Sequence, residues 1–226
     1  MKKFHYYIPI FLQKVGYIVF SVLYKTFLKI EIRGKENFVG LRGPVIIAAN
    51  HTSELDVTTA SMLLPFFSPL LPIYFVSDPK EKFKTFGWRN YIYGGIFFNL
   101  LGGYAIHSGH KDYAISLTDH IELLKKGRTV YIFPEGKRTL DGNLSPARGG
   151  LGFLAFQSKA TVVPVAINTF HALSWKVFLL RKRKVVIDIL KPIKADELFI
   201  TDNPTVDDYR RASQLVMDVI REKIYK

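Results

Sequence analysis

The stretch VIIAANHTSELD, residues 45–56, is an apolar run followed at once by polar and charged residues. A short continuous apolar run is typical of a strand that is buried on both faces of a sheet. The stretch TVYIFPEGKR, residues 129–138, repeats this arrangement further along the chain. In both stretches the polar residues come directly after the strand, so they are expected where each strand ends.

The rest of the chain alternates between strand and helix patterns. Further strands are expected at residues 29–33, 73–76, 162–167 and 185–190, and helices at residues 56–64, 111–126, 149–158 and 212–220. This alternation predicts an α/β fold with a largely parallel or mixed sheet flanked by helices. In such sheets ligands bind beyond the carboxyl ends of the strands. The residues that follow the two quoted strands are therefore expected at the ligand-binding edge.

The composition points to an anionic partner. The 226 residues include 32 Lys and Arg against 19 Asp and Glu, a net charge of +13, with 48% hydrophobic and 14% aromatic residues. Positive charge combined with many aromatic residues favours an anionic membrane surface and argues against nucleic acid. A basic stretch at residues 176–184 is either a solvated hairpin or a contact with anionic headgroups.

Cysteine, metal and cofactor chemistry are not indicated. The chain has no cysteine, which excludes disulfides, thiolate catalysis and Cys-ligated zinc. The six histidines show no metal-ligand spacing, so we expect no metal site. We also expect no cofactor, because neither nucleotide-binding glycine motif follows an expected strand.

Residues 1–29 are predicted to form a membrane-associated helical segment ahead of one α/β domain at residues 30–226. Residues 4–28 are mostly aromatic and aliphatic, but Lys14 and Lys25 interrupt them. On a helix, Lys14, Lys25 and Lys29 share one stripe, and a cationic stripe on an apolar helix is typical of the membrane interface. A spanning helix, which needs about 20 apolar residues, and a secretory signal peptide are the alternatives.

His51 and Asp56 are the candidate catalytic residues. Five positions apart on a regular helix, they would point about 140° apart. They can meet only if His51 precedes the helix, and the pair Ser53 and Asp56 resembles a capping box that starts a helix near Ser53. Asp56 could then orient a neutral imidazole whose other nitrogen removes a proton from a substrate hydroxyl. Alternatively, Asp56 only caps the helix and His51 is a surface loop residue.

The second stretch turns at residues 134–136 and presents basic side chains. An arginine such as Arg138 can bind two oxygens of a phosphate at once. Glu135 could accept hydrogen bonds from a polyol. The alternative is a bare turn with solvated charges.

Together and in this order, the motifs resemble the glycerophospholipid acyltransferase family, best known for 1-acyl-sn-glycerol-3-phosphate acyltransferases. The family block Asn-His-x-Ser-x-x-Asp matches residues 50–56, and Phe-Pro-Glu-Gly-Thr-Arg matches residues 133–138 with Lys137 in place of Thr. Weaker matches are a glycine-led block at residues 102–108, the basic–glycine pair Arg148–Gly149 and the apolar strand at residues 162–167. The resemblance covers about residues 30 to 190.

This resemblance implies an acyltransferase that moves a fatty acyl group from acyl-ACP or acyl-CoA to 1-acyl-sn-glycerol-3-phosphate. The product would be phosphatidic acid, made at the cytoplasmic face of the inner membrane. His51 would be the general base and Asp56 its partner. The acceptor-binding residues would be Glu135, Gly136, Arg138, Arg148 and Lys111.

Lys111 belongs to that set because Ser108 stands where the family's second block carries arginine. The same departure leaves open another lyso-lipid acceptor for the same chemistry. A basic, non-catalytic membrane-binding protein is the alternative from a different class.

Overall fold

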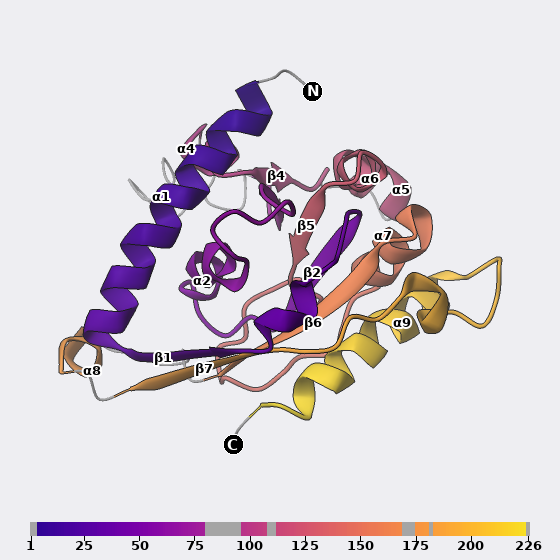
Figure 1. Cartoon of the computed structure of the whole chain (residues 1–226). Coiled ribbons are helices and arrows are strands. Elements are labelled where there is room, and N and C mark those ends of the chain that lie inside the picture. The colour runs from indigo at the N-terminus through magenta and orange to yellow at the C-terminus, as the bar shows by residue number, and fades with distance from the viewer. Residues whose placement is uncertain (1–3, 80–95, 108–111, 169–174, 181–182, 225–226) are drawn as a thin grey trace.

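The computed structural model describes residues 4–79, 96–107, 112–168, 175–180 and 183–224 (Figure 1). Within them seven strands form one sheet: β1 (Lys29–Arg33), β2 (Val45–Ala49), β3 (Ile73–Ser77), β4 (Gly103–Ala105), β5 (Thr129–Ile132), β6 (Thr161–Asn168) and β7 (Lys184–Ile189). The strand order is β1-β7-β6-β2-β5-β3-β4. Strands β6 and β7 pair antiparallel and the other neighbours pair parallel. The predicted α/β fold with a mixed sheet is confirmed.

Helices cover both faces of this sheet (Figure 1). They are α1 (Phe4–Phe27), α2 (Asp56–Leu63), α4 (Ile96–Leu100), α5 (Tyr113–Ser116), α6 (Thr118–Lys125), α7 (Gly150–Ser158), α8 (Trp175–Leu179) and α9 (Val206–Arg221), with 3₁₀ turns η1 (Lys35–Phe38) and η3 (Ala195–Leu198). Alternate residues of β2 enter two cores. Ile47 packs with residues of α1 and α2, whereas Ile46 and Ala48 pack with residues of α6, α7 and α9.

Strand β2 lies at the centre of the sheet, between β6 and β5, and all five of its residues are buried. Burial on both faces explains its unbroken apolar sequence. Val45 pairs with Thr129 and Ala48 pairs with Ile132, so β2 and β5 run in parallel and end at the same edge. The two loops quoted from the sequence therefore begin side by side.

One face of helix α1 packs against the rest of the protein. The Gln13 side chain is buried, donates to the carbonyls of Ile73 and Leu101 at 2.7 and 2.8 Å, and accepts from the Ile73 amide at 2.9 Å. Tyr24 is also buried, and its hydroxyl is hydrogen-bonded to Thr58 of α2. The described part of this segment, residues 4–28, thus contributes to the core, so deleting residues 1–28 would remove structural contacts as well as any membrane contact.

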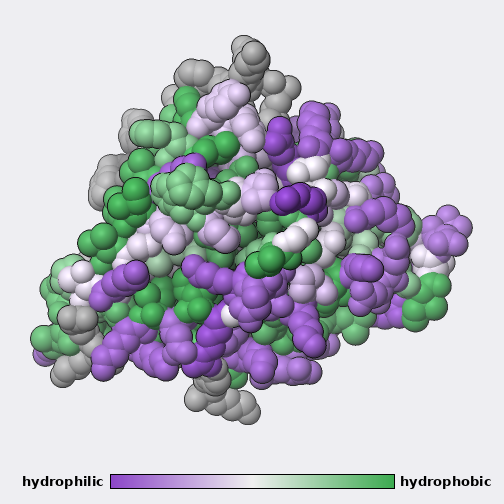
Figure 2. Space-filling model, in the orientation of Figure 1, coloured by the Kyte–Doolittle hydropathy of each residue, from purple (hydrophilic) through white to green (hydrophobic). Residues whose placement is uncertain are grey.

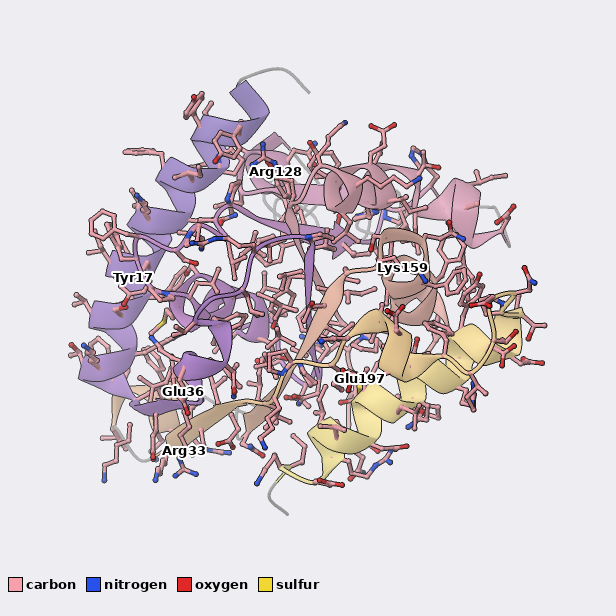
Figure 3. The ribbon with its side chains drawn as sticks, turned by 45° about the vertical axis from the view of Figure 1, so that its right-hand side comes forward. Tyr17, Arg33, Glu36, Arg128, Lys159 and Glu197 are labelled. Atoms are coloured by element: carbon pink, nitrogen blue, oxygen red, sulfur yellow. The ribbon has the colours of Figure 1, made fainter. Side chains whose placement is uncertain are left out.

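Two further contacts of aromatic side chains in α1 add to this packing. Arg128, labelled in Figure 3, lies 4.4 Å from the ring centroid of Tyr6 in the first turns of α1. Tyr17, also labelled there, meets Phe66 edge to ring at 5.4 Å. The outer face of α1 stays exposed and apolar; it carries Tyr7, Phe11, Val15, Ile18, Val19, Val22 and Leu23.

The helix expected at residues 111–126 is instead two short helices, α5 and α6, separated at Leu117. At the break, the Thr118 hydroxyl donates to the carbonyls of Ala114 and Ile115, and side-chain bonds of this kind to the preceding turn often bend a helix. Lys111 and Ser108 lie outside the described residues.

Other helix limits also differ in part from the predictions. Helix α2 begins at Asp56, as the alternation of strand and helix patterns predicted, and not near Ser53, as the resemblance to a capping box predicted, because the Asp56 carboxylate accepts from the Thr52 and Ser53 amides and holds them in a loop. Lys29 begins β1, so it does not continue the cationic stripe of α1.

Candidate active site

The loop after β2 brings His51 and Asp56 together. His51 Nδ1 lies 3.0 Å from Asp56 Oδ2, and the same oxygen accepts from the Thr52 and Ser53 amides at 2.7 and 2.8 Å. With its proton on Nδ1, the imidazole keeps Nε2 available to accept another proton. The Asp56 side chain is completely buried, whereas that of His51 is 18% exposed, so the base can be reached and its partner cannot.

Two neighbours of this pair fix its position. The ring of Phe133 stacks on the His51 ring, with centroids 3.9 Å apart and planes within 10° of parallel. The Asn50 side chain is buried and makes hydrogen bonds to both the amide and the carbonyl of Ile167 in β6. The sequence analysis gave neither residue a role. A polar residue directly after a buried strand, as at Asn50, was the available signal.

Glu135 joins the two strand-end loops. Its carboxylate is buried and accepts from the His51 amide at 2.8 Å and from the Ser145 amide at 2.7 Å. Burial raises the pKa of this carboxyl, and the two amide hydrogen bonds oppose the shift. Glu135 does not line the cavity described below. The geometry therefore does not support the expected contact between Glu135 and a polyol; the carboxylate fastens His51 to the neighbouring loop.

A cavity of about 760 Å³ opens beside His51 and extends towards α1. Its apolar wall includes Leu12, Phe20, Val57, Phe75, Phe98 and Leu101. Residues from both halves of the chain form it, because α1, α2, β3 and the loop after β5 all contribute to its lining. A volume of this size is typical of a site for a small organic ligand.

Cationic side chains lie on the wall of this cavity near the loop after β5. Lys137, Arg138 and Arg148 all line it, as does Gly136. Gly136 turns with a φ of 67°, and a Cβ there would lie 2.7 Å from Cδ of Arg148, so the turn leaves no room for a side chain. Among the expected acceptor ligands, Gly136, Arg138 and Arg148 therefore reach one cavity, and Lys111 lies outside the described residues.

The wall also carries acidic groups. Glu54 and Asp78 line the same cavity. Nη1 of Arg138 donates to Oε1 of Glu54 at 3.0 Å, and each of these side chains is 39% exposed. The sequence analysis did not anticipate this pair, because its members are 84 residues apart.

In the ranges that the structure describes, no group of three or more His, Asp or Glu side chains is placed to hold a metal ion. The arrangement found instead is a partly exposed histidine, paired with a buried carboxylate, that lines an apolar cavity next to exposed guanidinium groups. Such a site can hold an apolar chain, bind an anionic group and remove a proton from a hydroxyl between them. These are the requirements of group transfer to the hydroxyl of an anionic lipid.

A family model described as Acyltransferase matches residues 29–168, which is more than half of the chain. The chain therefore belongs to the acyltransferase family. The resemblance drawn from the two motifs is confirmed.

Two curated relatives are similar over most of this chain. Human 1-acyl-sn-glycerol-3-phosphate acyltransferase beta is 26% identical over 199 residues, which cover 86% of this chain and 66% of that protein. The chloroplastic 1-acyl-sn-glycerol-3-phosphate acyltransferase LPAT1 of Arabidopsis thaliana is 28% identical over 166 residues, which cover 74% of this chain and 41% of that protein. The chain thus spans about two thirds of the human protein and about two fifths of the plant protein.

The fold is also that of a solved structure. The crystal structure of the 1-acyl-sn-glycerophosphate (LPA) acyltransferase PlsC from Thermotoga maritima superposes with a TM-score of 0.63 at 21% identity. The match covers 94% of this chain and 78% of that one.

Proposed function

We propose that this protein transfers a fatty acyl group from acyl-ACP or acyl-CoA to the free hydroxyl of 1-acyl-sn-glycerol-3-phosphate, giving phosphatidic acid. The observation that carries the proposal is the His51–Asp56 pair at the mouth of an apolar cavity whose wall presents Arg138 and Arg148. The names of the human and Arabidopsis relatives support the same acceptor.

In this mechanism Nε2 of His51 removes the proton of the acceptor hydroxyl as its oxygen attacks the carbonyl carbon of the thioester. The carbon–sulfur bond then breaks, and the imidazolium returns its proton to the leaving thiolate. Asp56 holds the imidazole in the required tautomer and stabilises its positive charge. No acyl-enzyme is formed, because the substrate supplies the nucleophile.

In this proposal the two ends of the lipid contact different surfaces of the cavity. The apolar wall contributed by α1 and α2 holds an acyl chain, and the guanidinium groups of Arg138 and Arg148 bind the headgroup phosphate. Glu135 acts through its hydrogen bonds to the His51 and Ser145 amides and positions the base. Phe133 keeps the imidazole plane in place by stacking.

The test is a transfer assay with the purified full chain. Labelled acyl-ACP and acyl-CoA are each offered with 1-acyl-sn-glycerol-3-phosphate, lysophosphatidylethanolamine, lysophosphatidylglycerol or monoacylglycerol, and products are identified by mass. We expect phosphatidic acid as the main product. A different main product would assign the same chemistry to another acceptor. Vesicle binding without any acyl transfer would favour the non-catalytic alternative.

We further propose that the protein attaches to an anionic membrane at the cytoplasmic face of the inner membrane, with residues 1–29 as an interfacial segment and residues 30–226 as the catalytic domain. Among the described helices, Tyr6–Phe27 is long and apolar enough to cross a membrane by length and composition. Its docked inner face favours an interfacial position instead, because the helix would have to leave the sheet in order to span.

The surface supports this orientation. Figure 2 shows apolar residues along the edge where Figure 1 places α1 and α8, and mainly polar residues over α9. Phe67, Leu179 and Leu180 are exposed beside the outer face of α1, and Phe178 of α8 stacks on Phe27 at 5.2 Å. An apolar face of this kind with lysines nearby suits the boundary between headgroups and acyl chains.

Surface substitutions test the attachment better than a deletion, since α1 is part of the core. We expect the pair Phe11→Ser and Val22→Ser to reduce flotation with anionic vesicles in high salt, where buried apolar contact persists and surface charge is screened. The control is the pair Ile200→Ser and Val206→Ser. Both residues are also exposed, but Ile200 lies in the loop before α9 and Val206 in the first turn of α9. Equal flotation of the two double variants would contradict the proposal. Added nucleic acid should not change the flotation of either variant.

A further inference from the structure

The proposed headgroup ligand Arg138 already has an anionic partner in the protein. Glu54, which lies between the two members of the His51–Asp56 pair in sequence, lines the same cavity and accepts a hydrogen bond from Arg138 at 3.0 Å. An anionic headgroup that binds Arg138 must displace this carboxylate or share the guanidinium with it. The pair is thus placed where substrate binding and an internal contact compete.

We propose that Glu54 is a built-in competitor for the headgroup phosphate, which weakens the binding of both the anionic acceptor and the anionic product. This inference rests on the proposed function, because it assigns a role to the partner of the proposed phosphate ligand. Acceptor and product carry the phosphate at the same end, so one competing carboxylate acts on both.

The strength of the pair suits such a role. Both side chains are 39% exposed, and exposed ion pairs contribute only about 0.2–1 kcal/mol. A phosphomonoester carries close to two negative charges near neutral pH and accepts through three oxygens, so it can displace a single carboxylate. Because the competitor lowers the affinities of substrate and product equally, Glu54 favours product release without changing the chemical step.

The neighbouring Glu135 shows what a purely structural carboxylate looks like in this site. Glu135 is buried, and both of its oxygens accept from backbone amides. Glu54 instead lies on the cavity wall and meets a guanidinium that also lines the cavity. Its position fits regulation of access to Arg138.

The experiment compares the full-length wild type with Glu54→Gln and Glu54→Ala. Glu54→Gln keeps a neutral acceptor for Arg138 and removes only the charge, whereas Glu54→Ala removes the contact. We expect both variants to lower the KM for 1-acyl-sn-glycerol-3-phosphate and the inhibition constant of phosphatidic acid by the same factor, about two- to fivefold. The KM for the acyl donor and the KM for monoacylglycerol should not change.

Two further arms sharpen the result. Raising the salt concentration should shrink the difference between wild type and variants, because exposed charges are screened. Equilibrium binding of glycerol 3-phosphate, which contains the headgroup and cannot report on acyl transfer, should tighten by the same factor. Glu122→Gln, which removes an exposed ion pair with Lys126 on α6, is the matched control and should leave every constant unchanged.

The outcomes separate this inference from the proposed function. An active wild type whose constants do not change in either variant overturns the role of Glu54. A higher KM in Glu54→Ala with no change in Glu54→Gln also overturns it, because Glu54 would then orient Arg138. Tighter glycerol 3-phosphate binding by an enzyme that acylates none of the lipids would support the competitor and reject the proposed acceptor reaction.

Discussion

Two pairs of side chains lie beside the cavity, His51 with Asp56 and Glu54 with Arg138. In each pair the nitrogen and oxygen atoms that meet are 3.0 Å apart. In the first pair, Asp56 is completely buried and His51 is 18% exposed. In the second, Glu54 and Arg138 are each 39% exposed. Equal distances therefore join groups in very different surroundings.

The difference shows that burial and the supporting hydrogen bonds, rather than distance, decide what a pair can do. Asp56 is held by two backbone amides besides His51, so its carboxylate has one position. Such a fixed partner suits a base that must keep one tautomer through each turnover. A weak exposed pair exchanges partners readily, which suits a group that binds and releases a substrate.

The largest expected effect is at the buried pair. His51→Ala should lower kcat by about 10²- to 10⁴-fold, the usual contribution of a general base. The variant should remain folded at the assay temperature, because the imidazole is partly exposed. His107→Ala is the control, since His107 pairs with Asp119 on the surface and does not line the cavity. Near-normal turnover in His51→Ala would remove the proposed base.

Asp56→Asn should lower kcat by about 10²-fold and also destabilise the fold, by about 1–3 kcal/mol. The stability loss is expected because a buried charged acceptor of two backbone amides becomes neutral. Denaturant unfolding and steady-state kinetics measure the two effects separately. Asp119→Asn, at an exposed carboxylate, is the control; equal destabilisation by both substitutions would contradict the difference in burial.

Arg138→Lys keeps the charge of the exposed pair but loses the forked geometry of the guanidinium. We expect the specificity constant for 1-acyl-sn-glycerol-3-phosphate to fall by roughly 10- to 150-fold, corresponding to a charged hydrogen bond of about 1.5–3 kcal/mol. The loss should appear in KM, and monoacylglycerol should be used as before. Arg210→Lys, at an exposed pair with Asp207 on α9, controls for general effects. Equal losses with both acceptors would make Arg138 structural.

The smallest effect is the contribution of the exposed pair to stability. A double-mutant cycle with Glu54→Gln and Arg138→Gln should give a coupling in the free energy of unfolding of less than about 1 kcal/mol, and 0.5 M salt should reduce it further. The equivalent cycle for His51→Ala and Asp56→Asn should give a larger, less salt-sensitive coupling. If the two couplings were equal, burial would not distinguish the pairs.

Much of the fold followed from local patterns. The apolar run at residues 45–49 became the buried central strand β2, and the strands expected near residues 73, 162 and 185 formed β3, β6 and β7. The helix expected at residues 111–126 divided into α5 and α6 at Leu117, next to Thr118, whose hydroxyl bonds the preceding turn of the backbone. Hydrophobic spacing does not record such a competing hydrogen bond.

In the candidate site, too, some contacts could be predicted from local sequence and others could not. The contact between His51 and Asp56 spans five residues and could be anticipated from a loop followed by a helix start. The burial of Glu135 could not be anticipated from the sequence, because Glu135 meets its partners His51 and Ser145 only after β2 and β5 have paired. The docking of Gln13 against Ile73 likewise depends on where α1 packs, which no local pattern states.

Local patterns in the chain were enough to identify most of the strands and the residues that follow them, since apolar spacing and turn residues act within a few positions. They also indicated the acyltransferase family, because the two motifs carry reactive residues at short, fixed spacing. Folding was needed to bring Arg138 against Glu54, to bury Glu135 and to make α1 one wall of the cavity. These contacts join residues far apart in the sequence, and the order of the strands selects them.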